Sequence, residues 1–370
     1  MSRHTLQTST AQQKISNFLY SGDSASGVPQ RFVEFCRRSV EGIRGNMLYT
    51  DPDIPSNFGS TEYDGAESCT LNIDPVDEAN IVPLQPVQTS RPVVAVDTST
   101  LKLGELEDGV LCALRGAVVT LENGQYSFIR YGPFVFLLGY DAPIALEHFA
   151  NLGLSPFSGE PNIDNLLKRV RNMLERWLQF NVSTSTHDAF VLIDGSLTAG
   201  TPDNPSRELE RILENTRRSN SVLIAISKKT RLRVNNESLT ELLEKQHDPC
   251  LLDVDTEVTE QFPPYPVRFL GRVFVGKLAK LGYPFRIDLD RHVPTIHAAR
   301  EFSELMGTDI VDQGYPETLR LAHIFTTFTA TDVLAMQTFA TAHLGVQLVP
   351  KVALRRSLFG PFGTAWEAYH

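Results

Sequence analysis

Several features that define large protein classes are missing from this sequence of 370 residues. It has no run of about 18 or more apolar residues, so no transmembrane helix is expected. The polar stretch 1–20 lacks the apolar core of a secretory signal. The four cysteines are isolated, with no CxxC or other zinc spacing, and no disulfide framework is implied. A reducing compartment, the cytoplasm, fits this composition.

Common catalytic motifs are absent as well. The chain contains no GxSxG and no HExxH. Residues 271–277 read G-x-x-x-x-G-K, as a phosphate-binding loop begins, but Leu278 follows where Mg²⁺ needs a hydroxyl. The interior of that segment, Val273-Phe274-Val275, is typical of a strand rather than a flexible loop. We therefore do not expect a nucleotide hydrolase of that type.

Positive charge is scarce in the chain as a whole, with 34 Lys+Arg against 44 Asp+Glu and a net charge of −10. Taken alone, this argues against a general nucleic-acid coating protein. The acidic residues are concentrated, however. Residues 51–110 contain 12 acidic and two basic side chains, so this segment carries the whole excess and the rest of the chain is neutral.

The sequence pattern divides the chain into four segments. We expect a helical N-terminal extension over 1–50, including helices near 12–20 and 30–43, because apolar residues recur there at helical spacing. An acidic arm with repeated prolines covers 51–91 and is expected to be mostly irregular. An α/β domain covers 92–350, and a tail follows over 351–370.

The α/β domain has a characteristic order of elements. Apolar runs predict strands at 93–96, 109–121 and 125–138, and Asn123-Gly124 predicts a hairpin between the last two. A helix at 163–180, a strand at 189–193, a helix at 206–217 and a strand at 222–226 follow. Strands at 267–278 and 285–289 and helices at 295–306, 315–329 and 331–344 complete the pattern.

This order, β-β-β-α-β-α-β with late helices, is that of an RNase H-like fold. We expect a mixed sheet, in which three antiparallel strands precede parallel ones, flanked by helices. A right-handed crossover then places strand 189–193 parallel to strand 93–96.

Two carboxylates follow these neighbouring strands. Asp97 ends the run 93–96 and Asp194 ends the run 189–193, so both are expected at the carboxyl ends of strands, where open α/β sheets build their sites. An aspartate in such a place often only shapes a turn or caps a helix. Two like charges close together are costly unless a cation neutralises them, and Mg²⁺ or Mn²⁺ takes such oxygen ligands.

Two further side chains are candidates on helices. Glu175 lies at the flank of the apolar stripe of helix 163–180, where it either joins the carboxylates or forms a surface pair with Arg171. His323 shares a helical face with Tyr315 and Thr326, while Ile324 and Phe325 lie on the opposite, more apolar face that we expect to pack on the core. His323 should then point toward a site, a partner or solvent.

Basic residues gather after strand 222–226. Lys228, Lys229 and Arg231 either belong to a solvated loop or contact phosphate beside the carboxylates.

Four blocks of sequence, in this order, resemble the motifs of the NurA family of nucleases over residues 92–350. They are Val94-Ala95-Val96-Asp97, Val191-Leu192-Ile193-Asp194-Gly195-Ser196-Leu197, Ile226-Ser227-Lys228 and Gly314-Tyr315-Pro316…Leu319…Ala322-His323. One departure is Thr98-Ser99 after the first aspartate, where the family usually has Gly-Ser.

The resemblance implies an RNase H-like, Mn²⁺-dependent DNA nuclease, with Mg²⁺ as the alternative metal, in the cytoplasm of a prokaryote. It implies 5′→3′ exonuclease and single-strand endonuclease activity in DNA end resection and double-strand break repair. It also implies a homodimer that partners a HerA-type hexameric ATPase.

The same resemblance assigns roles to residues. Asp97, Glu175 and Asp194 would be the metal carboxylates, His323 a ligand or an acid/base group, and Tyr315 its neighbour in the site. Lys228, Lys229 and Arg231 remain the candidates for DNA contact. The alternative hypothesis is a non-catalytic RNase H-like module that binds DNA as the adaptor of a motor ATPase.

Overall fold

The computed structural model describes residues 28–50, 69–71, 80–140, 162–201, 204–230, 232–234, 237–261 and 267–351. The helix expected near 12–20 and the tail beyond Lys351 lie outside these ranges.

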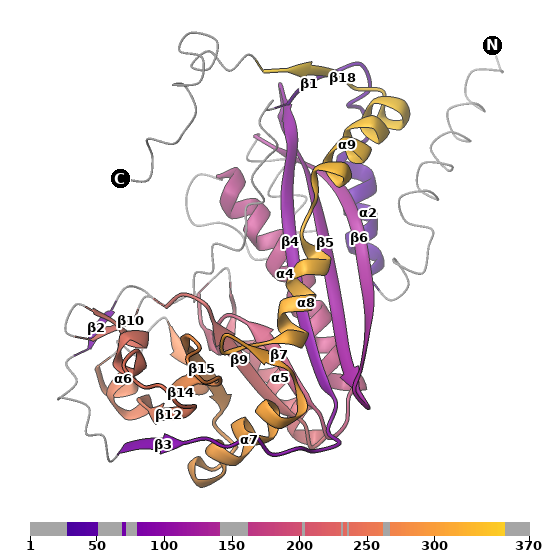
Figure 1. Ribbon diagram of the computed structural model, residues 1–370. Coiled ribbons are helices and arrows are strands. Elements are labelled where there is room, and N and C mark those ends of the chain that lie inside the picture. The colour runs from indigo at the N-terminus through magenta and orange to yellow at the C-terminus, as the bar shows by residue number, and fades with distance from the viewer. Residues whose placement is uncertain are drawn as a thin grey trace, which may run out of the picture.

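The centre of the molecule is a mixed sheet. Strands β4 (Val93–Leu106), β5 (Gly109–Glu122) and β6 (Gln125–Gly139) form an antiparallel meander, and β7 (Phe190–Asp194) and β9 (Val222–Ser227) extend it in parallel beside β4. Helix α4 (Ile163–Ser185) connects β6 to β7, and α5 (Ser206–Arg218) connects β7 to β9 (Figure 1). The order β6-β5-β4-β7-β9 is that of the RNase H-like fold, as predicted.

Further strands widen this sheet at both ends. Beyond β9 it continues antiparallel through β15 (Pro284–Asp290), β14 (Gly271–Lys277), β12 (Cys250–Asp253) and β3 (Ile81–Pro83). Residues 271–277 are thus a strand, as their composition predicts. At the other end, β1 (Met47–Thr50) pairs with β18 (Gln347–Pro350) and touches β4 at Glu105.

Short elements surround the sheet. The two-stranded pairs are β8 (Thr198–Ala199) with β13 (Arg268–Phe269) and β16 (Val311–Asp312) with β17 (Tyr315–Pro316). A small layer contains β2 (Cys69–Leu71), β10 (Leu232–Val234), β11 (Glu237–Ser238), the 3₁₀ helix η3 (Leu239–Leu243) and α6 (Asp255–Gln261).

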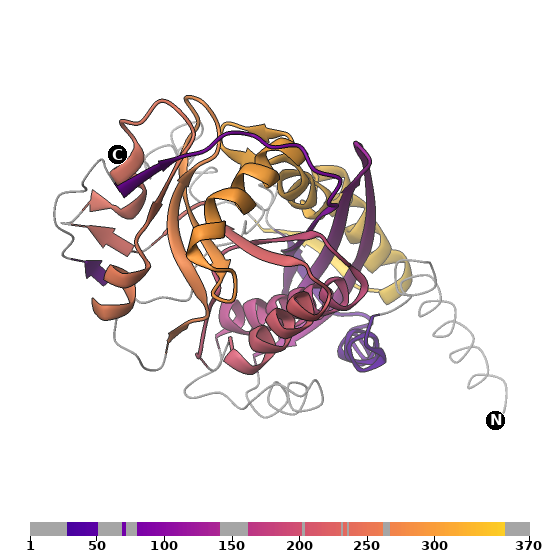
Figure 2. The ribbon, with the colours of Figure 1, turned by 90° about the horizontal axis from the view of Figure 1, so that it is seen from below.

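Helices cover both faces of the sheet (Figure 2). On one face, Val94 and Val96 of β4 pack with α4, α5 and α2 (Gln30–Ser39). On the other, Val93 and Ala95 pack with α7 (Thr295–Thr308) and α8 (Glu317–Thr326). This alternation is the period of two that a strand buried on both faces requires.

Local sequence explains where elements turn and begin. Asn123 and Gly124 have positive φ in the two-residue turn between β5 and β6, which confirms the predicted hairpin. The Asn162 side chain caps α4 by accepting a hydrogen bond from the Asp164 N–H at 2.8 Å.

Three expectations differ from the structure. Strand 93–96 does not end at Asp97 but runs on to Leu106, because β5 continues to pair with it. The helix expected at 315–329 is shorter, since Tyr315 and Pro316 form β17 and the helix begins at Glu317. The helix expected at 331–344 is α9 (Ala330–Phe339) followed by a π-helical turn, η4 (Ala340–Leu344).

Two strands also fall within the acidic arm. β2 pairs with β10, and β3 forms an edge of the main sheet beside β12. Leu84, just after β3, is buried in the core. Where it is described, part of the arm is therefore regular structure rather than loop. Among the described residues, no helix has the length and apolar character needed to cross a membrane.

Candidate metal centre

The parallel pairing of β4 and β7 places two carboxylates side by side. Val96 pairs with Ile193, so Asp97 and Asp194 are the next residues in register. They lie on the face of the sheet that α8 covers. The strand pairing predicted from the sequence is confirmed, with the difference that Asp97 lies inside a long strand and only Asp194 ends one.

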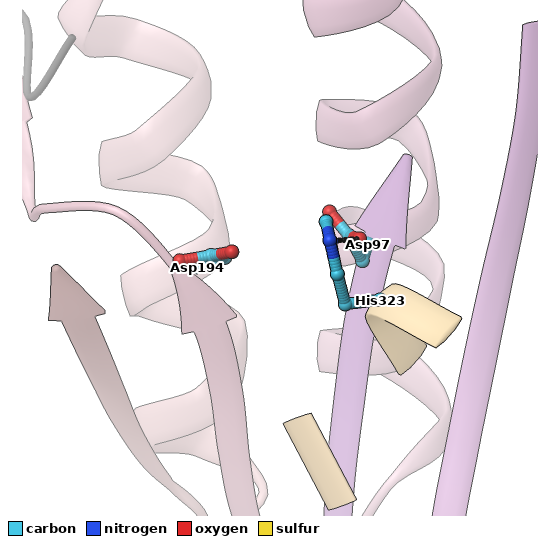
Figure 3. A group of neighbouring side chains, drawn as sticks. All are labelled: Asp97, Asp194 and His323. Carbon is cyan, nitrogen blue, oxygen red and sulfur yellow. Dashed lines mark hydrogen bonds and ion pairs between the residues drawn. The ribbon is translucent and has the colours of Figure 1, made fainter. Parts of the chain in front are cut away.

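His323 completes a group of three. One ligand atom from each of Asp97, Asp194 and His323 can be chosen so that all three lie within 4.8 Å of one another. Figure 3 shows Asp194 at the end of β7, facing Asp97 and the imidazole of His323. This is the one group of its kind among the described residues.

The helix α8 buries more of its surface against the sheet than expected, including the face that carries His323. Leu319, Ala322 and Thr326 are fully buried against the sheet, whereas Ile324 is 48% exposed. The prediction that Ile324 packs on the core was wrong, whereas Phe325 is partly buried and packs against the core as expected, and also stacks on the exposed Phe128 of β6 with ring centroids 4.0 Å apart. His323 therefore points inward toward Asp97 and not away from the sheet.

Hydrogen bonds fix the Asp97 carboxylate. Its Oδ2 lies 3.0 Å from His323 Nδ1 and accepts a hydrogen bond from Thr326 Oγ1 at 2.9 Å. The Thr326 hydroxyl was not singled out from the sequence, although its position three residues after His323 places it on the same helical face. Such contacts orient both the carboxylate and the imidazole.

Lys228 compensates the charge of Asp194. Its Nζ lies 2.6 Å from Asp194 Oδ2 and 5.2 Å from the ring centroid of Tyr315. Tyr315 is buried and packs on Phe285, so it borders the site through Lys228 rather than through His323. The neighbouring Lys229 is exposed, and Arg231 lies outside the described residues.

Glu175 reaches toward β4 from the opposite face of the sheet. Its Oε2 accepts a hydrogen bond from Thr98 Oγ1 at 3.1 Å, and its Oε1 accepts one from Gln179 Nε2 at 3.0 Å. The carboxyl is adjacent to Asp97 through Thr98 but does not join the group of three. Burial raises its pKa, Arg171 opposes the rise, and the Asp97 charge adds to it.

The donor set of the group suits a hard divalent cation. Two carboxylates and one imidazole offer oxygen and nitrogen ligands, and both aspartates are largely removed from water. The ammonium of Lys228 already marks this edge of the sheet as a place where positive charge is held.

Three solved nuclease structures are similar to this chain. The described chain is structurally similar to the NurA nuclease from Sulfolobus solfataricus, with 14% identity, 71% of this chain and 88% of that chain covered, and a TM-score of 0.47. A NurA bound to dAMP and manganese aligns with 9% identity over 70% of this chain and 90% of that one, at a TM-score of 0.41.

A third similar structure is the endonuclease V of Ciona intestinalis in complex with an inosine-containing DNA, with 12% identity, 66% and 90% coverage, and a TM-score of 0.34. No family model and no curated protein matches the sequence.

Proposed function

We propose that this protein is a Mn²⁺-dependent DNA nuclease that hydrolyses phosphodiester bonds, with 5′→3′ exonuclease and single-strand endonuclease activity. The observation that carries the proposal is the group formed by Asp97, Asp194 and His323 on neighbouring elements of an RNase H-like sheet. The cleavage polarity rests on the motif resemblance alone.

Each residue of the group would have a distinct part in the reaction. Asp97 and Asp194 would hold the metal, and Glu175, which contacts Thr98 beside Asp97 but lies outside the group of three, is proposed as a third carboxylate. When bound, a divalent cation in such a site supplies an activated water and charge stabilisation at phosphate oxygens. His323, whose imidazole is oriented by its contact with Asp97, would act as a further ligand or move a proton.

The cations beside the group fit an anionic substrate. Lys228 lies at the site and the exposed Lys229 follows it, so we propose that both contact DNA phosphates together with Arg231, two residues further along the chain. The ring of Tyr315 lies 5.2 Å from the Lys228 ammonium. The motif resemblance further supports a homodimer that acts with a HerA-type hexameric ATPase in DNA end resection in a prokaryotic cytoplasm.

The decisive experiment compares Asp194→Ala with the wild type on end-labelled single- and double-stranded DNA with Mn²⁺. Removing a ligand removes several kcal/mol of charge stabilisation, so we expect cleavage to fall by about 100-fold or more. Asp248→Ala, which changes an aspartate that is exposed and far along the chain, is the matched control and should cleave normally.

The outcome also separates the two hypotheses. Undiminished cleavage by a folded Asp194→Ala protein would contradict the proposal. Binding of DNA without cleavage, and without thermal stabilisation of the wild type by Mn²⁺, would instead support the non-catalytic adaptor.

A further inference from the structure

An ion pair lies buried within β15, where apolar side chains would be expected. Arg286 is fully buried and Asp288 is 1% exposed. Arg286 Nε donates to Asp288 Oδ1 and one of its terminal nitrogens to Oδ2, both at 2.8 Å. A buried pair of this kind usually adds little stability over apolar residues of the same volume. The pair also makes contacts outside β15.

Those contacts reach the turn that follows Asp194. Arg286 also donates to Thr198 Oγ1 at 3.0 Å, and the Leu197 N–H donates to Asp288 Oδ2 at 2.9 Å. The turn thus leaves β7 at Asp194, passes over β9 and is held on β15, two strands away.

The backbone of the turn is anchored on the same side. The Leu197 carbonyl accepts a hydrogen bond from the Leu270 N–H at 2.8 Å. Gly271 lets the two segments approach, since a Cβ there would come within 2.8 Å of Leu197 Cβ. Gly195, directly after Asp194, has a φ of 113° that favours glycine. The N–H and the carbonyl of Gly195 are both hydrogen-bonded to β9, so the start of the turn is held on β9 and its continuation on β15.

The turn is also linked to Glu175. The Thr198 carbonyl accepts from Asn204 Nδ2 at 2.7 Å, and Asn204 Oδ1 accepts from Arg176 at 2.8 Å. Arg176 donates to Gln179, which in turn donates to Glu175. One chain of side-chain hydrogen bonds therefore runs from the Asp194 turn to the other candidate carboxylate.

We infer that Arg286 and Asp288 are positioning residues that hold the turn 195–199, and through it Asp194, in the geometry needed to bind a divalent cation. The inference rests on the proposed function for the identity of the ligand. Partners that orient the ligands of a metal typically change its affinity by about 10- to 100-fold when they are lost.

The test separates positioning from stability. In the double variant Arg286→Met/Asp288→Leu, an apolar pair of similar volume replaces the ion pair, so the protein should stay folded. We expect Mn²⁺, titrated calorimetrically into the full chain, to bind about 10- to 100-fold more weakly. The control is Arg217→Met/Asp290→Leu, which removes an ion pair between α5 and the last residue of the same strand and should leave Mn²⁺ affinity unchanged.

A second pair of variants covers the case in which the double variant does not fold. Thr198→Val removes the hydroxyl that Arg286 contacts, and Thr198→Ser retains it. Weaker Mn²⁺ binding by Thr198→Val together with wild-type binding by Thr198→Ser supports the inference. Wild-type affinity in a folded double variant, or in Thr198→Val when the double variant does not fold, overturns it.

Failure of the proposed function gives a different result. If the wild type binds no Mn²⁺, the nuclease proposal fails, and amide hydrogen exchange over 195–199 decides the inference by itself. The inference is supported if these amides exchange at least about tenfold faster in the variants than in the wild type and the control. It is overturned if their exchange rates are unchanged.

Discussion

The buried carboxyl of Glu175, a proposed metal ligand, affects stability through its raised pKa. Its pKa is raised, mainly by burial, so the folded protein binds a proton there more tightly than the unfolded chain does. Below the unfolded pKa of about 4.3, the carboxyl is protonated in both states and does not lower the free energy of unfolding. As the pH rises from there toward the pKa of the folded protein, the buried carboxyl lowers the free energy of unfolding by an increasing amount.

We therefore predict that Glu175→Gln is more stable than the wild type at pH 7, by on the order of 1 kcal/mol, and that the difference disappears at pH 4. The glutamine amide can still contact Thr98 and Gln179. Urea unfolding at the two pH values measures the effect. A variant that is less stable than the wild type at pH 7 would show that the charged carboxylate is favoured in the fold.

The charge of Lys228 should weaken metal binding at the candidate site. Lys228 places a positive charge on the carboxylate that we propose as a metal ligand. Two positive charges about 4 Å apart repel by roughly 1 kcal/mol even in water, so Lys228→Met should tighten Mn²⁺ binding by about fivefold. Lys229→Met is the control, since this exposed neighbour has no contact with Asp194 among those described. Equal or weaker Mn²⁺ affinity in Lys228→Met would contradict the prediction.

The connection between α8 and α9 depends on another buried cation. Arg115 of β5 pairs with Asp332 at 2.9 Å, donates to the Thr327 carbonyl and lies over the ring of Phe328. The hydrogen bond from Arg115 holds the pKa of Asp332 well below its usual range. A lowered pKa means that the stabilisation is complete above about pH 4, the unfolded value, and is lost as the pH falls below it.

Asp332→Asn should consequently destabilise the protein by about 2 kcal/mol at neutral pH, because it leaves the buried Arg115 without a charged partner. Thermal unfolding of both proteins at pH 7 and pH 3 tests this. The gap in stability should narrow at the lower pH, and an equal gap at both values would exclude the ion pair as its source.

The strands and helices differ in how well local sequence predicts their register and orientation. The strand register that brings Asp97 and Asp194 together follows from two apolar runs, a helix between them and the hand of the crossover. The orientation of α8 does not follow from local sequence in the same way, because the exposed Ile324 is as apolar as the residues of this helix that are buried. Which face of a short helix packs on a sheet depends on long-range contacts, here those of Thr326 and His323 with Asp97.

The contacts of the buried polar residues could be predicted least well from the sequence. Arg286 and Asp288 alternate with apolar neighbours in β15, a spacing that places both on one face, but nothing local shows that this face receives the turn after Asp194. Glu175 is similar: its contact with Thr98 depends on how α4 lies across β4.

At the scale of the whole molecule, the net charge of −10 arises from residues 51–110. In a nuclease, such a segment would compete with DNA for the basic side chains near the site. Neutralisation tests this better than deletion, because β2 and β3 lie within the segment. The variant replaces five carboxylates by their amides: Asp51, Asp53, Glu62, Asp64 and Glu67.

We predict that this variant binds single-stranded DNA more tightly than the wild type at low salt, and that the difference vanishes near 1 M salt, where charges are screened within about 3 Å. A control with the same change in net charge neutralises exposed carboxylates elsewhere: Glu41, Glu122, Glu214, Glu244 and Asp248. If the control gains as much affinity as the variant, the effect belongs to total charge and not to the arm.

The pairing of β4 with β7 has a consequence for how this sequence can vary. Four successive parallel pairs, from Val93–Phe190 to Val96–Ile193, set the position of Asp194 beside Asp97. Gaining or losing one residue within β7 would shift the aspartate by about 3.3 Å and turn it to the opposite face of the sheet. Related chains can therefore exchange one apolar residue for another in this strand, but they must keep its length.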